Sequence, residues 1–240
     1  DPHADYWRGL NTGRNCVAFG MHADADVCGD FRPHGLGGVL EIRTATESVE
    51  VSLRVAGQHN AANALNAAAC CLAAGATLAD VSAGLAGFEG VKGRLQRVAG
   101  PHGALILDDT YNANPDSVRA GIDVLASTPG HTVLVLGDMG EVGETSAQVH
   151  DEIGGYAKSK GVDGLFALGE MSAVAVRNFG EGAHHFRTPE TLVAALVRQL
   201  GADTVVLVKG SRFMRMERVV NLLAAVHNSA PSINGGSHAA

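Results

Sequence analysis

The feature that most constrains the fold is an alternation of short apolar runs with helical patterns, beginning at about residue 98. The apolar runs occupy Ala104–Asp109, Thr132–Gly137, Gly164–Leu168 and Thr204–Lys209. Such nearly continuous apolar runs are typical of parallel strands that are buried on both faces of a sheet. The helical patterns lie at Asp116–Ser127, Ser146–Ser159, Met171–Asn178, Pro189–Leu200 and Phe213–Val226. This alternation predicts an α/β domain with a doubly wound sheet.

The preceding part of the chain has a different pattern, and residues 1–56 are predicted to be rich in strands. The expected strands are Val17–Met21, Gly38–Arg43 and Ser48–Val55. Because Gly, Asp and Pro separate these runs at short spacing, we expect antiparallel pairing. Two helices should follow, at Asn60–Ala74 and Leu78–Ala86. Thr77 can cap the second helix. At the other end of the chain, residues 229–240 are polar and small, and we expect a disordered tail there.

Composition and charge exclude several classes of protein. The formal net charge of -7 disfavours general binding of nucleic acids or anionic membranes. No apolar run approaches the roughly 18 residues that a membrane-spanning helix needs. The cysteines form no C-x-x-C pair, and Cys70 and Cys71 are expected to be buried free thiols in an Ala-rich helix. We therefore expect a cytoplasmic protein with no nucleic-acid partner and no membrane insertion.

Two common nucleotide-binding motifs are absent from the sequence. It contains neither the G-x-x-x-x-G-K-[ST] phosphate loop nor the G-x-G-x-x-G fingerprint, so an oxidoreductase with a nicotinamide cofactor is weakly supported. The 11 histidines are scattered and form no H-E-x-x-H motif. We expect no metal site within this chain.

Polar residues follow three of the predicted strands. These segments are Asp108–Pro115, Gly137–Glu141 and Lys209–Arg212. Because ligands of open parallel sheets bind beyond the carboxyl ends of the strands, the three segments are expected to meet at one site. Simpler interpretations remain open, since Asn114 and Pro115 form a common turn and helix start. Lys209 and Arg212 could be solvated charges, although a Lys-Gly-Ser-Arg turn with Ser211 as a helix cap also suits an anion.

The first predicted helix carries an unusual row of asparagines. Asn60, Asn63 and Asn66 recur at a spacing of three and share one stripe of the helix. Asparagine is unfavourable inside helices, so one of them is explained by a cap but three suggest a use. A carboxamide can both donate and accept hydrogen bonds, which suits the edge of an adenine ring or a junction between domains.

These motifs together resemble the Mur ligases. Gly57–Leu65, Gly93–Gln96 and Asp108–Pro115 occur in the order and spacing of that family. Tyr-Asn-Ala-Asn-Pro at 111–115, Gly-Asp-Met-Gly-Glu at 137–141 and Lys-Gly-Ser-Arg at 209–212 are most similar to one member of it. That member joins D-alanyl-D-alanine to UDP-N-acetylmuramoyl-tripeptide. The resemblance extends from the first residues to about Val226.

The resemblance implies a place for this chain within a longer enzyme. Residues 1–97 would be the distal, β-rich and helical part of a central ATPase domain, and residues 98–228 a C-terminal Rossmann-like domain. An N-terminal UDP-binding domain, the phosphate loop, and the Glu and His that hold Mg2+ in the family would all precede residue 1. The implied cofactors are ATP and Mg2+, with the metal ligands outside this sequence. On this basis we expect the fragment to be inactive alone and monomeric.

The implied reaction has two steps. ATP phosphorylates the terminal carboxylate of the tripeptide, and the amine of D-alanyl-D-alanine then attacks the acyl phosphate. Such chemistry depends on cations and oriented donors rather than on a covalent nucleophile.

The resemblance implies which residues would contact ATP, the dipeptide and the transferred phosphate. Asn60 and Asn63 would contact the adenine side of ATP. Arg94 would reach its phosphate or ribose, and Asp109 the ribose hydroxyls. The cleft between nucleotide and dipeptide would be lined by Tyr111, Asn112 and Asn114. The transferred phosphate or the substrate carboxylates would face Lys209, Ser211 and Arg212, and the catalytic residues would be Arg94, Lys209 and Arg212.

The resemblance also implies domain closure about a hinge near Gln96–Gly103. Two alternative functions remain. One is a different amide ligase of the superfamily, such as the meso-diaminopimelate-adding enzyme or folylpolyglutamate synthetase, although the former usually has Tyr-Ala-His where this chain has Tyr111-Asn112-Ala113. The other is a non-catalytic module that binds a nucleotide or a dipeptide.

Overall fold

The computed structural model describes residues 3–21 and 24–229, and the chain divides into two compact units between Glu89 and Gly90. This division lies earlier than the predicted boundary between residues 97 and 98. The reason is a short strand, β5 (Gln96–Ala99), which pairs antiparallel with β6 (Leu105–Asp109) and so belongs to the second unit. The expected hinge near Gln96–Gly103 therefore lies inside the second unit and not at its border.

The first unit contains a sheet with the strand order β1-β2-β3-β4. Its elements are α1 (Ala4–Leu10), β1 (Phe19–Gly20), β2 (Val27–His34), β3 (Gly37–Arg43), β4 (Ser48–Leu53), α2 (Gln58–Ala73) and α3 (Leu78–Ala86). Strands β2, β3 and β4 are antiparallel as predicted, whereas β1 pairs parallel to β2. Strand β2 was not predicted because only its first three residues are buried and its second half is polar.

Helix α2 packs on this sheet with small side chains. Its buried residues are Ala61, Ala64, Leu65, Ala68 and Ala69, and they share one apolar core with Leu40, Ile42 and Val51 of the sheet. Cys70 and Cys71 lie beyond this stripe and are exposed, so the prediction that they are buried is wrong. Thr77 caps α3 as predicted, and Asp80 completes a reciprocal capping box.

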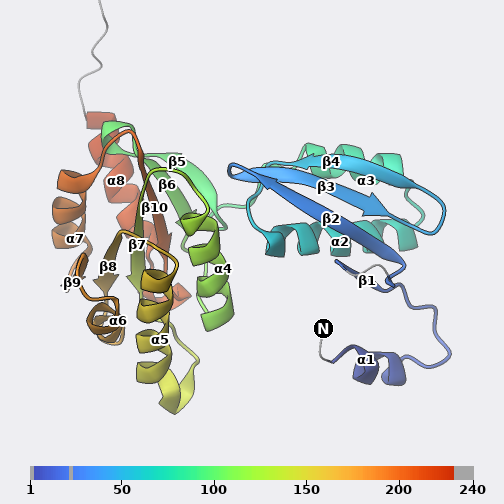
Figure 1. Cartoon of the computed structure of the whole chain (residues 1–240), viewed down its shortest axis with the longest axis horizontal. Coiled ribbons are helices and arrows are strands. Elements are labelled where there is room, and N and C mark those ends of the chain that lie inside the picture. The colour runs from blue at the N-terminus through green and yellow to red at the C-terminus, as the bar shows by residue number, and fades with distance from the viewer. Residues whose placement is uncertain (1–2, 22–23, 230–240) are drawn as a thin grey trace, which may run out of the picture. The chain divides into compact units, whose positions relative to one another are not determined.

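The second unit is built on a sheet with the strand order β5-β6-β10-β7-β8-β9 (Figure 1). The remaining strands are β7 (His131–Gly137), β8 (Gly164–Leu168), β9 (Ala183–Phe186) and β10 (Thr204–Lys209). All described neighbours in this sheet are parallel except β5 and β6. The predicted Rossmann-like, doubly wound fold is confirmed. Strands β8 and β10 have the predicted bounds, whereas the short edge strands β5 and β9 were not predicted.

Helices cover both faces of this sheet. They are α4 (Pro115–Ala126), α5 (Ser146–Ser159), α6 (Ser172–Phe179), α7 (Pro189–Leu196) and α8 (Glu217–Ser229). Helices α7 and α8 pack on the face that carries Val206 and Val208 of β10. Helix α4 packs on the opposite face, where Gly121 lies against Leu207 of the same strand. Figure 1 shows α7 and α8 on one side of the sheet and α4 on the other.

Two of these helices differ from their predicted bounds for local reasons. Helix α7 ends at Leu196 and continues only as a 3-10 turn, Val197–Gln199. Helix α8 starts at Glu217 because Arg215 has a left-handed φ of 51° that interrupts the chain after the 3-10 turn Arg212–Met214. Ser229, which we expected in a disordered tail, ends α8, and the rest of that predicted tail lies outside the described residues. Within residues 3–21 and 24–229, no helix has the length and apolarity that crossing a membrane requires.

Candidate active site

The three polar strand ends lie side by side in the second unit. Strand β10 lies between β6 and β7 and is parallel to both, so the three carboxyl ends meet at one edge of the sheet. Lys209 is level with Asp109 on one side and with Leu136 on the other. The residues that follow these ends are called the rim here: Asp109–Asn114, Gly137–Glu141 and Lys209–Arg212. The prediction that these segments meet is confirmed.

A buried ion pair joins two of the strand ends. The Nζ of Lys209 lies 2.5 Å from Oδ2 of Asp109 and donates a second hydrogen bond, of 3.0 Å, to the carbonyl oxygen of Asn112. The Lys209 side chain is only 3% exposed and that of Asp109 14%, so Lys209 is not a solvated charge. Burying a charge is tolerated when it is paired and hydrogen-bonded, as here. The pair orients Asp109 and the Asn112 carbonyl.

The neighbouring carboxylate, Asp108, has a different task. It is buried and accepts hydrogen bonds from the backbone N–H and the hydroxyl of Thr110, at 3.1 and 2.6 Å. It thus stabilises the turn that leaves the strand. Successive strand residues point to opposite faces, which explains why Asp108 and Asp109 have different partners.

Ser211 connects all three rim segments. Its hydroxyl donates to the carbonyl of Ala113 at 2.9 Å and accepts from the N–H of Gly140 at 2.7 Å. Its own N–H donates to the carbonyl of Asp138 at 3.0 Å. We predicted Ser211 as a helix cap, but its side chain makes no capping bond in the turn that follows. Ser211 therefore occupies the predicted cap position, but its hydroxyl bonds between strand ends instead of capping the turn.

Glycines allow these segments to approach one another. A Cβ placed on Gly210 would lie 3.0 Å from the Cα of Gly137 and 2.6 Å from Cγ of Met216. A Cβ on Gly137 would lie 2.7 Å from Sδ of Met216. A Cβ at either position would therefore have to displace the Met216 side chain, so glycine lets the strand ends approach closely.

Asp138 and His150 anchor the Gly137–Glu141 segment to α6 and α5. Neither residue was assigned an individual role from the sequence. The carboxylate of Asp138 accepts from the backbone N–H groups of Glu170, Met171 and Ser172, at 3.0, 3.2 and 2.7 Å, at the start of α6. His150 accepts from the N–H of Met139 at 2.9 Å. Asp138 could have been found from its position at the end of a buried strand, within the polar segment Gly137–Glu141.

Arg94 and Tyr111 stack on the exposed side of the rim. The guanidinium carbon of Arg94 lies 4.4 Å from the centre of the Tyr111 ring, a cation–π contact. The Tyr111 N–H donates to the carbonyl of Gly93 at 3.0 Å. Gly93 has a φ of 74°, and a Cβ there would lie 3.2 Å from the Tyr111 nitrogen. Tyr111 is 50% exposed, so this pair presents a flat cationic surface to solvent.

The other predicted residues of the rim have mixed roles. The side-chain oxygen of Asn112 accepts from the N–H of Arg212 at 3.3 Å. Asn114 caps α4 in a capping box with Ser117, as the simpler interpretation of this residue held. The Arg212 side chain is 65% exposed and pairs loosely with Glu217 at 3.4 Å. Asn112 and Arg212 thus face solvent next to the buried Lys209–Asp109 pair, whereas the carboxamide oxygen of Asn114 is occupied.

The asparagines of α2 belong to the first unit, whereas the rim belongs to the second. Asn60 donates to the carbonyl of Ala56 at 2.7 Å, and Asn63 donates to Oδ1 of Asn60 at 3.4 Å. Asn63 and Asn66 are exposed. The predicted stripe is present, and its hydrogen bonds are local to the helix and its start.

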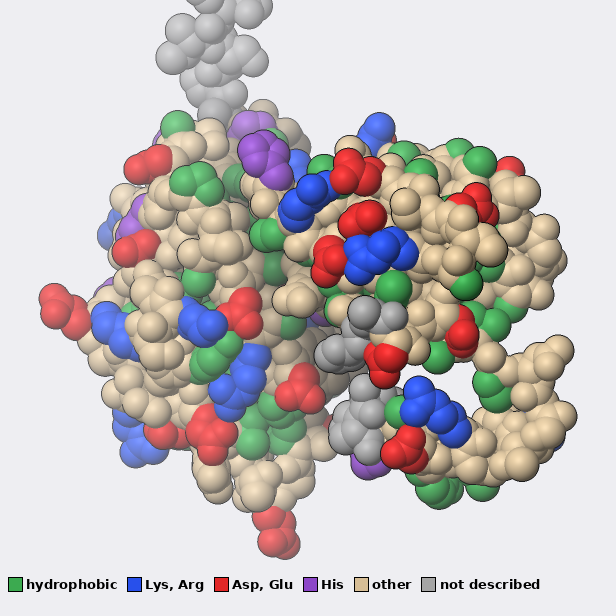
Figure 2. Space-filling view, turned by 45° about the vertical axis from the view of Figure 1, so that its right-hand side comes forward, with side chains coloured by type: hydrophobic (Ala, Val, Ile, Leu, Met, Phe, Trp, Pro, Cys, Tyr) green, Lys and Arg blue, Asp and Glu red, His purple; other side chains and the backbone are tan. Residues whose placement is uncertain are grey.

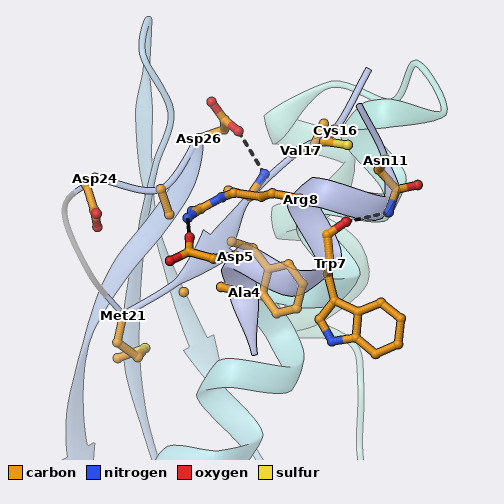
Figure 3. A pocket seen from close by; sticks show the side chains of 14 residues that line it. Ala4, Asp5, Trp7, Arg8, Asn11, Cys16, Val17, Met21, Asp24 and Asp26 are labelled. Carbon is orange, nitrogen blue, oxygen red and sulfur yellow. Dashed lines mark hydrogen bonds and ion pairs between the residues drawn. The ribbon is translucent and has the colours of Figure 1, made fainter. Parts of the chain in front are cut away.

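A separate cavity of about 1010 Å³ lies in the first unit. It is lined by α1 and by the chain around β1, and Figure 3 shows Arg8 paired with Asp5 and Asp26 accepting from the N–H of Ala18. None of the described residues that line it is a predicted site residue. Within the described parts of the chain, no group of three His, Cys, Asp or Glu side chains could hold a metal ion. Figure 2 shows basic and acidic side chains interspersed on the visible face.

The fold and the rim define a Rossmann-like α/β domain with polar residues at the carboxyl ends of its central strands. Residues 93–212 match the family described as Mur ligase, glutamate ligase domain. The chain therefore belongs to the Mur ligase family.

Several similar proteins carry the same name. The chain is 42% identical over 184 residues to UDP-N-acetylmuramoyl-tripeptide--D-alanyl-D-alanine ligase of Escherichia coli strain K12, covering 76% of this chain and 40% of that protein. A crystal structure of MurF from Acinetobacter baumannii superposes with a TM-score of 0.85 at 31% identity, over 94% of this chain and 50% of that one. MurF from Thermotoga maritima in complex with ADP has a TM-score of 0.79 at 26% identity, over 95% and 52%. The chain thus spans about 40% of the length of the E. coli relative.

Proposed function

We propose that this chain forms part of the active site of an ATP-dependent ligase that joins D-alanyl-D-alanine to UDP-N-acetylmuramoyl-tripeptide. The observation that carries the proposal is the rim, where the Lys209–Asp109 pair and Ser211 join three strand ends in a member of the Mur ligase family. Similar proteins named for this activity support the choice of substrates. The remaining parts of such an enzyme would come from outside these residues. We further propose that the enzyme acts as a monomer in the cytoplasm.

The proposed reaction needs positive charge and fixed donors. A carboxylate oxygen of the tripeptide attacks the terminal phosphorus of ATP, ADP leaves, and an acyl phosphate forms. The amine of the dipeptide then attacks the acyl carbon, loses a proton, and expels phosphate as the amide bond forms. Because negative charge moves between oxygens in both steps, fixed cations and dipoles lower the barrier.

The exposure of each residue refines its proposed role. Arg94 and Arg212 are exposed and can reach anionic groups of ATP or of the substrates, as the catalytic cations of this chain. Lys209 is buried and already bonded to Asp109 and Asn112, so we propose that it acts chiefly by orienting them. Asp109 would then present an oriented carboxylate to the ribose hydroxyls.

The softer proposals follow from the same geometry. Tyr111, Asn112 and Asn114 would border the dipeptide site, and Asn60 and Asn63 of the first unit would contact the adenine. Ser211 joins the rim segments, and we propose that it acts on the substrate indirectly, by positioning its neighbours. By the resemblance to the family, Mg2+ would be held by residues outside this sequence.

The deciding experiment is an amide-ligation assay of the complete ligase that contains this sequence. Phosphate release is measured with ATP, UDP-N-acetylmuramoyl-tripeptide and one of three acceptors: D-alanyl-D-alanine, meso-diaminopimelate or L-glutamate. We expect turnover only with the dipeptide. Turnover with a single amino acid would show a different amide ligase, and nucleotide binding without turnover would show a non-catalytic module.

A further inference from the structure

Helix α5 carries a fully buried histidine whose two ring nitrogens are both hydrogen-bonded. His150 is 0% exposed. Its Nε2 lies 2.9 Å from the backbone nitrogen of Met139, and its Nδ1 lies 2.7 Å from the carbonyl oxygen of Ser146, one turn earlier in the helix. The first contact joins α5 to the Gly137–Glu141 segment of the rim, and the second lies within α5.

The chemistry of these partners determines the state of the ring. A backbone N–H can only donate, so Nε2 must carry a lone pair, and a carbonyl can only accept, so Nδ1 must carry the hydrogen. The ring is therefore neutral and protonated on Nδ1. Neither the other neutral tautomer nor the imidazolium can accept from Met139.

The contact with Met139 lies one residue from a bond of the rim. Gly140, the next residue, donates its N–H to the Ser211 hydroxyl at 2.7 Å, and that hydroxyl donates to the Ala113 carbonyl at 2.9 Å. Met139 is itself buried, at 2% exposure, so its N–H has no access to water as a substitute partner. His150 thus holds the Asp138–Met139 peptide, which adjoins the Met139–Gly140 peptide that carries the Gly140 N–H.

We propose that His150 is a positioning residue of the rim, which acts in its Nδ1-protonated form by fixing the Met139–Gly140 backbone beneath Ser211. The placement follows from the hydrogen bonds alone, and its relevance to catalysis rests on the proposed ligase function. His150 touches no substrate and acts through Gly140 and Ser211.

Two substitutions separate the two bonds of the ring. In His150→Gln, the side-chain oxygen can reach the position of Nε2 and accept from Met139, whereas the bond to Ser146 is lost. In His150→Asn, the side-chain amide can reach the position of Nδ1 and donate to Ser146, whereas the acceptor for Met139 is lost. Each variant keeps one bond and the same carboxamide group, and the two side chains differ by one methylene, so each is a control for the other.

The first measurement is NMR of the 240-residue chain. We expect nitrogen shifts of a protonated Nδ1 and an unprotonated Nε2 in the unsubstituted protein, which needs no variant to fold. Protonation of Nε2 instead would overturn the proposal. Amide exchange at Met139 and Gly140 should stay within about threefold of the unsubstituted rate in His150→Gln and rise at least roughly tenfold in His150→Asn. Equal exchange in the two variants would also overturn it.

The second measurement is turnover of the complete ligase with each substitution. We expect kcat to fall at least roughly tenfold in His150→Asn and to recover most of that loss in His150→Gln, with the KM for ATP nearly unchanged in both. A merely structural role would lower thermal stability in both variants and leave kcat equal between them, which would count against positioning. An unsubstituted ligase without turnover would refute the proposed function, while the NMR result would still decide the placement of His150.

Discussion

The asparagines of α2 and the polar strand ends of the rim both looked like ligand sites in the sequence, and the structure treats them in opposite ways. Asn60 and Asn63 bond to partners four and three residues away. Lys209 and Ser211 bond to partners 100 and 98 residues away. Polar groups of the first kind can be exchanged for others with little effect on the fold. Those of the second kind hold separate strands together, so the rim is both a candidate site and a structural joint.

The largest expected effect is the loss of the buried lysine. In Lys209→Ala the Asp109 carboxylate stays largely buried without its cation, and we expect the free energy of unfolding of the second unit to fall by about 3 to 5 kcal/mol. Urea unfolding monitored by circular dichroism measures this. Arg212→Ala is the control, because that exposed side chain should change stability by less than about 1 kcal/mol. An equal loss of unfolding free energy in both variants would show that the buried Lys209 contributes no more to stability than the exposed Arg212.

The close approach of strand ends gives the next effect. Gly210→Ala places a Cβ against Cγ of Met216 and the backbone of Gly137, and we expect a loss of about 1 to 3 kcal/mol from overpacking. Gly84→Ala, in α3, meets no atom within 4 Å and should be neutral or stabilising by up to about 1 kcal/mol. Thermal unfolding of both variants tests the pair. An unchanged thermal stability of Gly210→Ala would show that the rim segments move apart at little cost in free energy.

Ser211 tests whether the rim segments depend on one hydroxyl. Ser211→Ala leaves the Gly140 N–H and the Ala113 carbonyl without their buried partner, so we expect a loss of about 1 to 3 kcal/mol. Ser117→Ala removes a hydroxyl of similar size at the exposed start of α4 and should cost only about 1 kcal/mol. Hydrogen exchange at Gly140 should rise in the first variant and not in the second. An unchanged Gly140 would contradict the bridging role.

The smallest structural effect is expected in α2. Asn63→Ala removes one long, local hydrogen bond and introduces a better helix former, so the free energy of unfolding should change by less than about 0.5 kcal/mol. If Asn63 contacts adenine as proposed, the KM for ATP of the complete ligase should nevertheless rise by roughly tenfold, the value of one hydrogen bond. Steady-state kinetics over a range of ATP concentrations measures this. An unchanged KM for ATP would contradict the proposed contact between Asn63 and the adenine.

A test of the proposed ribose contact by Asp109 needs two measurements. Replacing Asp109 with alanine would leave Lys209 buried and unpaired, so a raised KM for ATP alone would be ambiguous. The unfolding free energy of the variant has to be measured beside its kinetics.

The sequence by itself determined the buried parallel strands β6, β7, β8 and β10 and the place of the rim. Continuous apolar runs such as Thr204–Lys209, alternating with helices, are typical of a parallel sheet buried on both faces, and the carboxyl ends of parallel strands share one edge. Local chemistry likewise determined the caps at Thr77 and Asn114, because a cap and its partner lie three residues apart.

The tertiary structure decided which polar side chains are joined. The strand order β6-β10-β7 brings Lys209 to Asp109 and Ser211 to both neighbouring strand ends, and no periodicity in the chain encodes that order. The edge strand β5 was missed for a different reason, because it is mostly exposed and no apolar run marks it. The burial of His150 was missed because it depends on the packing of α5 against the Gly137–Glu141 segment, which forms only with the tertiary structure.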